Sequence, residues 1–353
     1  MLSNRAAKVS IDLAALQHNF NQVKKYSSNS YIMPVIKANA YGHGMLQVAK
    51  ALTEADGFAV AQLSEAVALR ENGIDKPITV FQGFSNRAQL EAIIQYDLRP
   101  ALNQSWQIDY LEAVTQNASI DVWLKVNTGM GRLGVQLDEV ETCYQRLLKL
   151  KLINQIGLMM HFANADEPTH ISNKLQLDRF LTLSNHYKIQ TSASNSAAII
   201  SDFYREQSWL RPGIMLYGSS PLQGVTAAEL QLKPVMSLHA ELIAINELKK
   251  DQTVGYGDSW VCPEDMQVGI VNIGYGDGYP RHAQNSPLAV NGQLCQLIGR
   301  VSMDSVAVDL RGVQAECGDV VECWGGQIPV DEVAKCAETI SYELLCSMGR
   351  ILR

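Results

Sequence analysis

A lysine follows directly after a short apolar run near the start of the chain. Residues 31–36 are typical of a short buried strand, and Lys37 stands where that strand would end. Burial lowers the pKa of an amine, and a neutral amine can attack a carbonyl carbon to form an imine. A single lysine in such a place is more often paired with an acid or extended to solvent, so its neighbours decide between the two roles.

The first two thirds of the chain alternate short β-like runs with helical patterns. Residues 63–71 and 87–95 are helical in pattern, and Asp12 is placed to cap a helix that runs to about Lys25. The alternation predicts a parallel sheet, and eight units over roughly 200 residues favour a (β/α)₈ barrel over an open doubly wound sheet. No Gly-x-Gly-x-x-Gly follows the first run, which counts against a dinucleotide fold. The β-like runs are residues 31–36, 57–61, 78–81, 99–102, 120–126, 156–161, 189–193 and 213–217.

Barrels of this kind carry their chemistry at the C-terminal ends of the strands. Each polar residue there has a structural alternative: His161 could be a core histidine, Ser196 could cap a helix, and Arg132 could form a salt bridge. Their meeting on one face, as cations, an imidazole, a hydroxyl and backbone amides, favours a site for an anionic aromatic cofactor. The residues expected at this face are Lys37, Lys125, Arg132, His161, Asn195, Ser196, Arg211, Gly213 and Ile214.

The pattern changes about two thirds of the way along the chain. Residues 236–242 alternate apolar and polar side chains, which is the period of a half-buried strand. Asn291-Gly292 stands between two β-like runs and is a strong hairpin signal. These features predict a mostly antiparallel β region, closed by a helix over about 331–346.

The length of 353 residues exceeds what one ordinary core occupies, so two domains are expected. The change of pattern predicts a barrel domain over residues 1–232 and a β domain over residues 233–353. Residues 7–11 could pair with either domain, and the sequence leaves this open.

The composition is that of a soluble globular protein, with 47% hydrophobic and 18% charged residues. A formal net charge of −7 argues against nucleic acid or an anionic membrane as the main partner. No apolar run approaches the roughly 20 residues of a membrane helix, and residues 1–8 lack the apolar stretch of a signal peptide. The seven cysteines are scattered without metal-ligand spacing, which predicts reduced thiols, no metal site and a cytoplasmic location.

The stretch around Lys37 carries a specific resemblance to a known family. Residues 35–44 read Val-Ile-Lys-Ala-Asn-Ala-Tyr-Gly-His-Gly. This unbroken string closely resembles the cofactor-lysine motif of the alanine racemase family, fold-type III enzymes that use pyridoxal 5'-phosphate. The resemblance implies that Lys37 carries the cofactor as an imine and that the hydroxyl of Tyr41 contacts the cofactor phosphate.

Further segments of the predicted barrel match the same family. The resemblance implies that His161 stacks beside the pyridine ring and that Arg132 bonds the phenolic oxygen of the cofactor and contacts the substrate. Lys125 matches a lysine that is carbamylated in some members and positions this arginine. Arg211 would face the pyridine nitrogen; because a guanidinium stays protonated, it could not give the ring a proton, and transamination would be suppressed. The segments that match the phosphate-binding groups are Asn195-Ser196 and Gly213-Ile214.

The predicted β domain supplies the second half of the resemblance. Residues 254–257 match the segment with the catalytic tyrosine of the family, here Tyr256. A second Gly-Tyr-Gly turn, at Tyr275, matches a tyrosine of the substrate entrance. The spacing to Met303, whose backbone amide would meet the substrate carboxylate, assigns the catalytic role to Tyr256. Tyr342 matches a further tyrosine beside the phosphate.

The resemblance implies an enzyme that interconverts L-alanine and D-alanine, for supply of D-alanine to the cell wall or for alanine catabolism. Lys37 would serve the D-alanine face of the substrate and Tyr256 the L-alanine face. The family forms head-to-tail homodimers in which the tyrosine and the methionine come from the other subunit, so shared active sites are expected. Asn127 and Asn164 depart from the usual residues of the family and bear on substrate preference.

Three alternatives stand beside this interpretation. One is a related amino-acid racemase with a broader substrate range. Another is a fold-type III decarboxylase, against which Arg211 counts because decarboxylases need a protonated ring nitrogen beside an acid. The third is a pyridoxal phosphate-binding homeostasis protein without enzymatic activity, against which the β domain with Tyr256 and Met303 counts.

Overall fold

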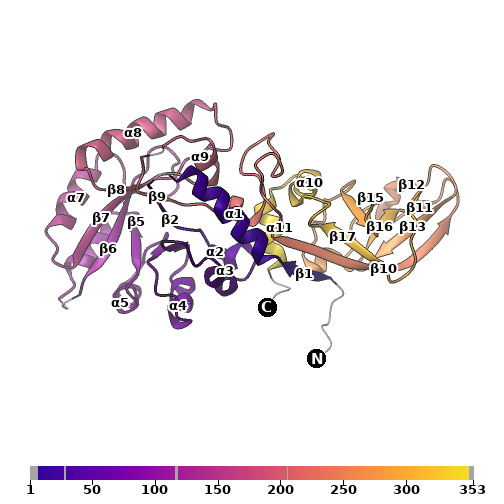
Figure 1. Cartoon of the computed structure of the whole chain (residues 1–353), viewed down its shortest axis with the longest axis horizontal. Coiled ribbons are helices and arrows are strands. Elements are labelled where there is room, and N and C mark those ends of the chain that lie inside the picture. The colour runs from indigo at the N-terminus through magenta and orange to yellow at the C-terminus, as the bar shows by residue number, and fades with distance from the viewer. Residues whose placement is uncertain (1–6, 28, 116–117, 205, 350–353) are drawn as a thin grey trace.

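A computed structural model describes residues 7–27, 29–115, 118–204 and 206–349. Figure 1 shows two lobes side by side, one formed by the first two thirds of the chain and the other mainly by the last third. Residues 1–6, which belong to the segment without a predicted signal peptide, lie outside the described residues. Within the described ranges, no helix combines the length and the apolarity needed to cross a membrane.

Six parallel strands form most of the sheet in the first lobe. Neighbours in sequence are neighbours in space, because each strand is followed by a crossover that returns to the same edge. Most of their side chains are buried, as expected of strands covered on both faces, and the exceptions lie mainly at the start of β7. In order they are β3 (Phe58–Val60), β4 (Ile78–Val80), β5 (Arg99–Leu102), β6 (Ile120–Lys125), β7 (Ile153–Met159) and β8 (Gln190–Ser192).

Two further strands close this sheet into a barrel. β2 (Tyr31–Ile32) and β9 (Trp209–Leu210) pair with each other in parallel. Beyond β2, Val35 forms a parallel bridge to Ala59 of β3. At the other edge, the Arg211 N–H donates to the Ser194 carbonyl at 3.1 Å, which joins the ends of β9 and β8. The predicted (β/α)₈ barrel is therefore confirmed.

The predicted position of the eighth strand, at residues 213–217, is wrong. The strand is β9, and residues 214–217 form the short 3₁₀ helix η1 (Ile214–Tyr217), which is completely buried. A short buried apolar run has the same composition in either conformation, so hydrophobicity alone does not separate them. As a consequence, Arg211 and Gly213 lie just beyond the end of the eighth strand, where barrel chemistry is placed.

Helices surround the barrel on the outside (Figure 1). The predicted helices at 63–71 and 87–95 are observed with the same bounds. The predicted capping by Asp12 is also observed, since its carboxylate accepts the N–H groups of Ala14 and Ala15 at 2.8 and 3.0 Å. The helices are α1 (Leu13–Tyr26), α3 (Met45–Ala51), α4 (Leu63–Glu71), α5 (Arg87–Gln95), α6 (Trp106–Glu112), α7 (Val140–Leu148), α8 (Ile171–Tyr187) and α9 (Ser196–Ile200).

An antiparallel sheet forms the second lobe, as predicted. Its strands follow the order β1-β10-β13-β16-β15-β14-β17, and an extra pairing between β10 and β17 curls the sheet into a barrel-like shape. Asn291 and Gly292 have φ values of 49° and 78°, the left-handed pair that a two-residue hairpin requires. β1 comes from the start of the chain and pairs with β10. The strands are β1 (Lys8–Ile11), β10 (Met236–Leu248), β13 (Met266–Val271), β14 (Pro287–Val290), β15 (Gln293–Ile298), β16 (Val306–Asp309) and β17 (Val320–Trp324).

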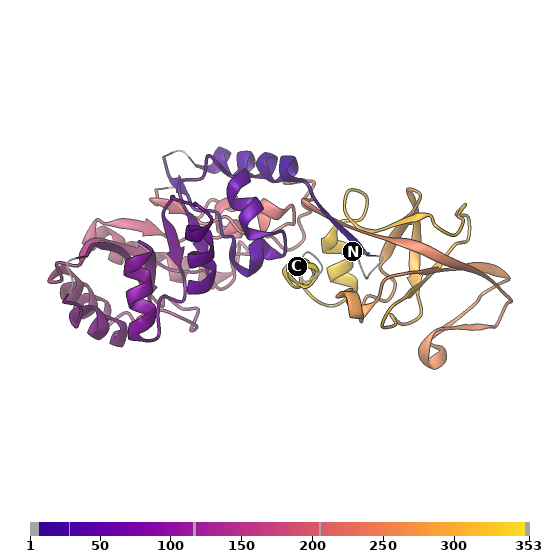
Figure 2. The same cartoon turned by 90° about the horizontal axis from the view of Figure 1, so that it is seen from below.

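The predicted helix over 331–346 is two helices, so that prediction is wrong in its continuity. α10 (Val330–Cys336) and α11 (Ser341–Met348) are separated by Glu338, whose φ of 53° ends the first helix. α11 lies where the two lobes meet (Figure 2). A Cβ on Gly42 would stand 2.1 Å from the Leu345 carbonyl oxygen, so only glycine lets this helix approach the barrel so closely.

Candidate active site

A cavity of about 470 Å³ opens at the C-terminal ends of the barrel strands. It gathers every residue that the sequence predicted for the barrel face and adds Tyr342 from α11. Residues that sequence reasoning did not single out also line it, among them Phe81 and Gln82 after β4. Phe81 is the last residue of the predicted β-like run at 78–81 and Gln82 follows it, and this place at a strand end is the signal that could have found them. The predicted residues in its wall are Lys37, Tyr41, Lys125, Arg132, His161, Asn195, Ser196, Arg211, Gly213, Ile214 and Tyr342.

The turn that carries Lys37 is left-handed. In α2 (Lys37–Tyr41), the four residues Ala38 to Tyr41 have φ values of 52–55°. Left-handed backbone costs about 1–2 kcal/mol for each residue with a side chain, so the rest of the fold must compensate for this turn. One such contact is the Asn39 side chain, whose oxygen accepts the Met45 N–H at 2.8 Å. Backbone strain of this kind is typical of active sites and ligand-binding sites.

Two lysines in the cavity have lowered pKa values. Burial, together with the nearby charge of Arg132, lowers the pKa of Lys37. Burial lowers the pKa of Lys125 to about 7, and the cations Arg211, Arg132 and Lys37 act in the same direction. Both amines therefore have a larger neutral, nucleophilic fraction near neutral pH than an exposed lysine.

His161 and Arg211 form a fixed pair on one wall. The Arg211 guanidinium donates to the Ser192 hydroxyl and to the Met160 carbonyl, each at 2.6 Å, and lies 3.4 Å from Nδ1 of His161. Burial lowers the pKa of Arg211 to about 9, so this group still carries its charge at neutral pH. Burial and the surrounding cations hold the pKa of His161 well below its usual range, which leaves a neutral, flat ring facing the cavity.

A second wall brings two tyrosines and a close backbone approach together. The ring centroids of Tyr41 and Tyr342 lie 5.8 Å apart. The Gly213 N–H donates to the Ser196 hydroxyl at 2.7 Å, and a Cβ on Gly213 would stand 2.8 Å from the Tyr41 hydroxyl. The helix cap considered for Ser196 is formed by Asn195 instead, whose side chain accepts an N–H of α9. The Ser196 hydroxyl therefore faces Gly213 and the cavity.

Arg132 reaches the cavity from the loop after β6. Asn127 shapes this loop, because its side-chain oxygen accepts the N–H groups of Gly129 and Gly131 at 3.2 and 2.9 Å. A Cβ on Gly134 would stand 2.6 Å from the Asn127 nitrogen, so glycine is required where the loop returns to the strand. Asn127, which departs from the family pattern, thus has a structural role in holding the loop of Arg132.

The three predicted site residues of the second lobe do not line the cavity of the same chain. The exposed fractions are 69% for Tyr256, 40% for Tyr275 and 54% for Met303. Tyr275 and Met303 are close in space, since the Gly276 N–H donates to the Met303 carbonyl at 2.8 Å. The structure therefore brings together the barrel residues and Tyr342, but it leaves these three on the surface of the second lobe.

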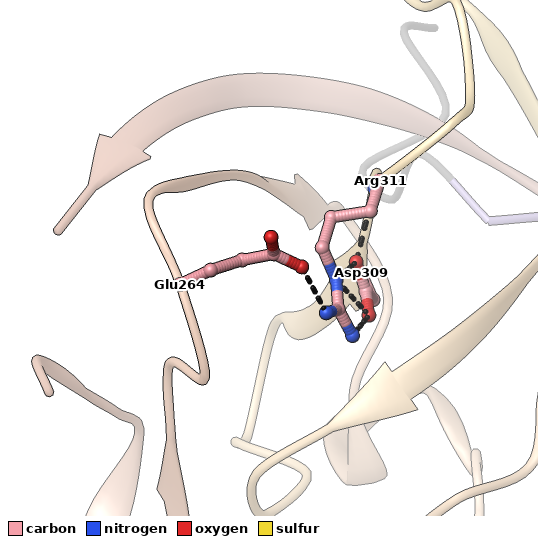
Figure 3. A network of polar contacts seen from close by, with 3 residues as sticks. All are labelled: Glu264, Asp309 and Arg311. Carbon is pink, nitrogen blue, oxygen red and sulfur yellow. Dashed lines mark hydrogen bonds and ion pairs between the residues drawn. The ribbon is translucent and has the colours of Figure 1, made fainter. Parts of the chain in front are cut away.

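Tyr256 projects on a small hairpin that we call the Tyr256 arm, residues 253–261. It consists of β11 (Thr253–Val254), the turn η2 (Tyr256–Asp258) and β12 (Trp260–Val261). The base of the arm packs in a small buried cluster that contains Val254 and Cys262. Beside it, as Figure 3 shows, Arg311 donates to both oxygens of Asp309 and, at 2.7 Å, to Glu264, which follows the arm. The arm is thus tied to β16 by charged groups that remain partly exposed.

The barrel cavity fits pyridoxal 5'-phosphate. Its wall holds four cationic side chains and, among the described lining residues, no carboxylate, so an anion is favoured there. The approach of Gly213 to the Tyr41 hydroxyl leaves no room for a side chain beside the groups that would hold a phosphate. The amine of Lys37 has the chemistry to bind an aldehyde, and the neutral ring of His161 offers an aromatic face. The four cations are Lys37, Lys125, Arg132 and Arg211.

Comparison with known proteins gives the same family from sequence and from structure. The alanine racemase N-terminal domain matches residues 11–221 and the alanine racemase C-terminal domain matches residues 235–353. An alanine racemase of Coxiella burnetii is 43% identical, covering 98% of this chain and 97% of the relative. One from Nitrosococcus oceani is 44% identical over 97% of each chain.

Solved structures agree with these sequence matches. The biosynthetic alanine racemase from Pseudomonas aeruginosa superposes with a TM-score of 0.94 at 40% identity, over 98% of this chain and 97% of that one. The alanine racemase from Acinetobacter baumannii gives a TM-score of 0.92 at 40% identity over 97% of each chain. The resemblance seen in the sequence is confirmed, and the chain belongs to the alanine racemase family.

Proposed function

We propose that this protein interconverts L-alanine and D-alanine, with pyridoxal 5'-phosphate held at Lys37. The observation that carries the proposal is the cavity itself, in which Lys37 shares one space with Arg132, His161 and Arg211 and with the wall formed by Tyr41, Ser196, Gly213 and Tyr342. The relatives that match over nearly the whole chain are alanine racemases, which supports alanine as the substrate.

Each wall of the cavity has a task in this proposal. The phosphate end would be held by the wall that carries three hydroxyl groups beside a close backbone approach. Its residues are Tyr41, Ser196, Gly213, Ile214, Asn195 and Tyr342. His161 lies against the ring, and Arg132 bonds the phenolic oxygen and the substrate. When bound, the cofactor withdraws electrons from the α-carbon of the attached amino acid and so acidifies its α-proton.

Arg211 limits the chemistry to proton exchange. Its side chain already makes short hydrogen bonds to Ser192 and Met160 and keeps its charge at neutral pH. A guanidinium donates hydrogen bonds without giving up a proton, so it does not serve as an acid toward its neighbours. We therefore expect little transamination beside racemisation.

Proton transfer on the two faces is assigned to two residues. Lys37 takes and returns the proton on the D-alanine face, because its lowered pKa leaves part of the amine neutral. Tyr256 does so on the L-alanine face, and the Met303 amide meets the substrate carboxylate. Both lie on the exposed surface of the second lobe, which supports their use by another subunit. The active unit is then a homodimer whose sites are each built from the barrel domain (1–232) of one chain and the β domain (233–353) of its partner.

The remaining assignments concern context. Tyr275 would line the substrate entrance beside Met303, and Lys125 would carry a carbamate that holds Arg132. We place the enzyme in the cytoplasm, where D-alanine for the cell wall is made or alanine is broken down. No observation favours a decarboxylase or a non-catalytic cofactor carrier over the racemase.

The test is optical. Purified protein with added pyridoxal 5'-phosphate is mixed with L-alanine, and circular dichroism is followed at a fixed wavelength. The signal should decay to zero as D-alanine forms, and Lys37→Ala should abolish the decay, whereas Lys50→Ala on α3 should leave it unchanged. A constant signal would contradict the proposal, and a panel of other amino acids would then show whether the substrate or the reaction is wrong.

A further inference from the structure

The carboxylate of Glu65 ties two strand ends of the barrel together. Glu65 lies in the first turn of α4. Its Oε1 accepts the Ala38 N–H at 2.6 Å, and its Oε2 accepts the N–H groups of Ala61 and Gln62 at 3.0 Å each. Ala38 directly follows Lys37, and Ala61 follows β3. One side chain therefore satisfies backbone donors from the turn after β2 and from the loop after β3.

The bond to Ala38 acts on the direction of Lys37. Ala38 is the first residue of the left-handed turn, with φ of 52°. Its N–H belongs to the peptide unit that joins it to Lys37, so fixing this group fixes the plane from which the Lys37 side chain departs. A hydrogen bond from a backbone N–H to a carboxylate is charge-assisted and stronger than one between neutral groups. Glu65 therefore offsets part of the strain of this turn.

The same carboxylate supplies negative charge to a cationic site. The groups that act on Lys37 come from several elements: burial and then Arg132 of the loop after β6 lower its pKa, whereas Cys346 of α11 and, after it, Glu65 of α4 raise it. Lys125 at the end of β6 lies in the same wall, and its amine is a cation only while it is protonated and unmodified. Cys346 has its own pKa raised by burial, so its thiol is neutral near pH 7. Among the unmodified groups named here, Glu65 is thus the anion.

We propose that Glu65 is a positioning residue of the cofactor site, which orients Lys37 through the Ala38 N–H and balances the cationic charge around its amine. This inference rests on the proposed role of Lys37 as the cofactor lysine. Glu65 does not line the cavity, so it acts through Lys37 rather than on substrate or cofactor.

Two substitutions separate orientation from charge. Glu65→Gln keeps the length of the side chain but removes the charge and places an NH₂ group against backbone donors. Glu65→Asp keeps the charge but shortens the reach to Ala38. Glu71→Gln is the matched control, because Glu71 lies at the other end of α4 and accepts a hydrogen bond from the Tyr96 hydroxyl at 2.9 Å, away from the site.

The first readout is cofactor affinity in the full-length protein. After removal of any cofactor with hydroxylamine, pyridoxal 5'-phosphate is titrated back and its dissociation constant is measured by absorbance. Both Glu65 variants should bind about tenfold more weakly than the wild type, as expected for loss of one charge-assisted hydrogen bond, and the control should not change. Thermal unfolding of each cofactor-free variant reports whether it is folded.

The second readout is the titration of the lysine itself. Competitive acetylation with isotopically labelled acetic anhydride, followed by peptide mass mapping, gives the pH midpoint of Lys37 and of other lysines in one cofactor-free sample. Loss of a negative charge disfavours the protonated amine, so Glu65→Gln should move the Lys37 midpoint to lower pH, and Glu65→Asp should move it less. Exposed lysines acetylated in the same sample serve as the internal reference for each variant.

An unchanged Lys37 midpoint in Glu65→Gln overturns the proposal, even if affinity falls, because loss of a helix cap alone would produce that fall. Unchanged affinity in both variants overturns it as well. Borohydride reduction of the wild-type complex with pyridoxal 5'-phosphate keeps the two proposals apart. Reduction leaves a pyridoxyl group on the lysine that binds the cofactor, and peptide mapping locates it. If the group is found on Lys37, the cofactor site is correct irrespective of the results for Glu65. If it is found on another residue, the proposed function itself is wrong.

Discussion

The barrel cavity and the Tyr256 arm differ in how much of each is completed by its own chain. Lys125 and Arg211 are 7% and 3% exposed, and their neighbours come from strands, loops and α11 of the same molecule. Tyr256 is 69% exposed in the turn of a hairpin whose base is packed in a small buried cluster and flanked by charged groups (Figure 3). The difference in burial supports the proposal that one chain preorganises the cofactor site and that proton transfer on the second face depends on assembly of two chains.

The strongest challenge to this comparison is the variant Tyr256→Phe. Loss of a general base should slow racemisation by on the order of a thousandfold, equally in both directions because the equilibrium constant of racemisation is one. Exchange with solvent separates the faces. In D₂O, Lys37 should still replace the α-hydrogen of D-alanine, but L-alanine should keep its own, as proton NMR would show.

Two controls accompany that experiment. Tyr110→Phe removes a hydroxyl from the outer helix α6 and should leave both racemisation and exchange unchanged. Washout of the α-hydrogen from L-alanine at the wild-type rate in Tyr256→Phe would show that another group serves this face.

Mixed dimers test whether the two regions meet between chains. Lys37→Ala and Tyr256→Phe subunits should each be nearly inactive, whereas a mixed dimer of the proposed kind would contain one site with both wild-type residues. Random mixing in equal amounts should restore about a quarter of wild-type activity, because half of the dimers are mixed and each has one active site of two. Circular dichroism of alanine measures the recovery. If mixing restores nothing although mixed dimers form, the site is complete within one chain.

The pKa of Lys125 predicts a modification inside the barrel cavity. At a pKa of about 7, a large fraction of the amine is neutral at neutral pH and can add carbon dioxide. The carbamate should increase as pH rises through 7 and be lost below it, since protonation removes the nucleophile. Carbon-13 NMR with labelled bicarbonate measures this, with Lys125→Ala as the blank. A signal that persists in the blank would place the carbamate elsewhere.

The smallest effect is expected at the base of the Tyr256 arm. Arg311→Met removes the ion pairs that join Asp309 to Glu264. The side chains of all three residues are in contact with solvent. Activity should fall less than about fivefold, with cofactor affinity unchanged, because the arm loosens while the barrel cavity does not. Steady-state kinetics and cofactor titration check both parts. A loss of cofactor affinity in Arg311→Met would show that the two regions are coupled.

The sequence predicted the barrel and most of its cavity for a definite reason. Strands alternating with helices place the residues after each strand on one face, so Lys37, His161 and Asn195 could be grouped without coordinates. The eighth strand was misplaced because the buried run at 214–217 has the composition of a strand. Arg211 was still assigned to the right face, since it follows the true strand, β9.

Other features depend on contacts that a linear pattern does not carry. Four residues after Lys37 are left-handed, and three of them are Ala38, Ala40 and Tyr41, which seldom adopt this conformation. The local preference of these residues therefore predicts a right-handed or extended backbone. Tertiary contacts from α4 and α11 decide it. The break at Glu338 is likewise set by how α11 must turn to reach the barrel.

The contact between Gly42 and Leu345 has a consequence for the order in which the protein is made. Tyr342 and Leu345 leave the ribosome long after Lys37, yet they form one wall of the cofactor cavity and the support behind its lysine turn. During synthesis, the cavity of the barrel therefore lacks the wall formed by α11, even after all eight barrel strands have been translated. Capture of the cofactor should follow, rather than guide, the synthesis of the second lobe.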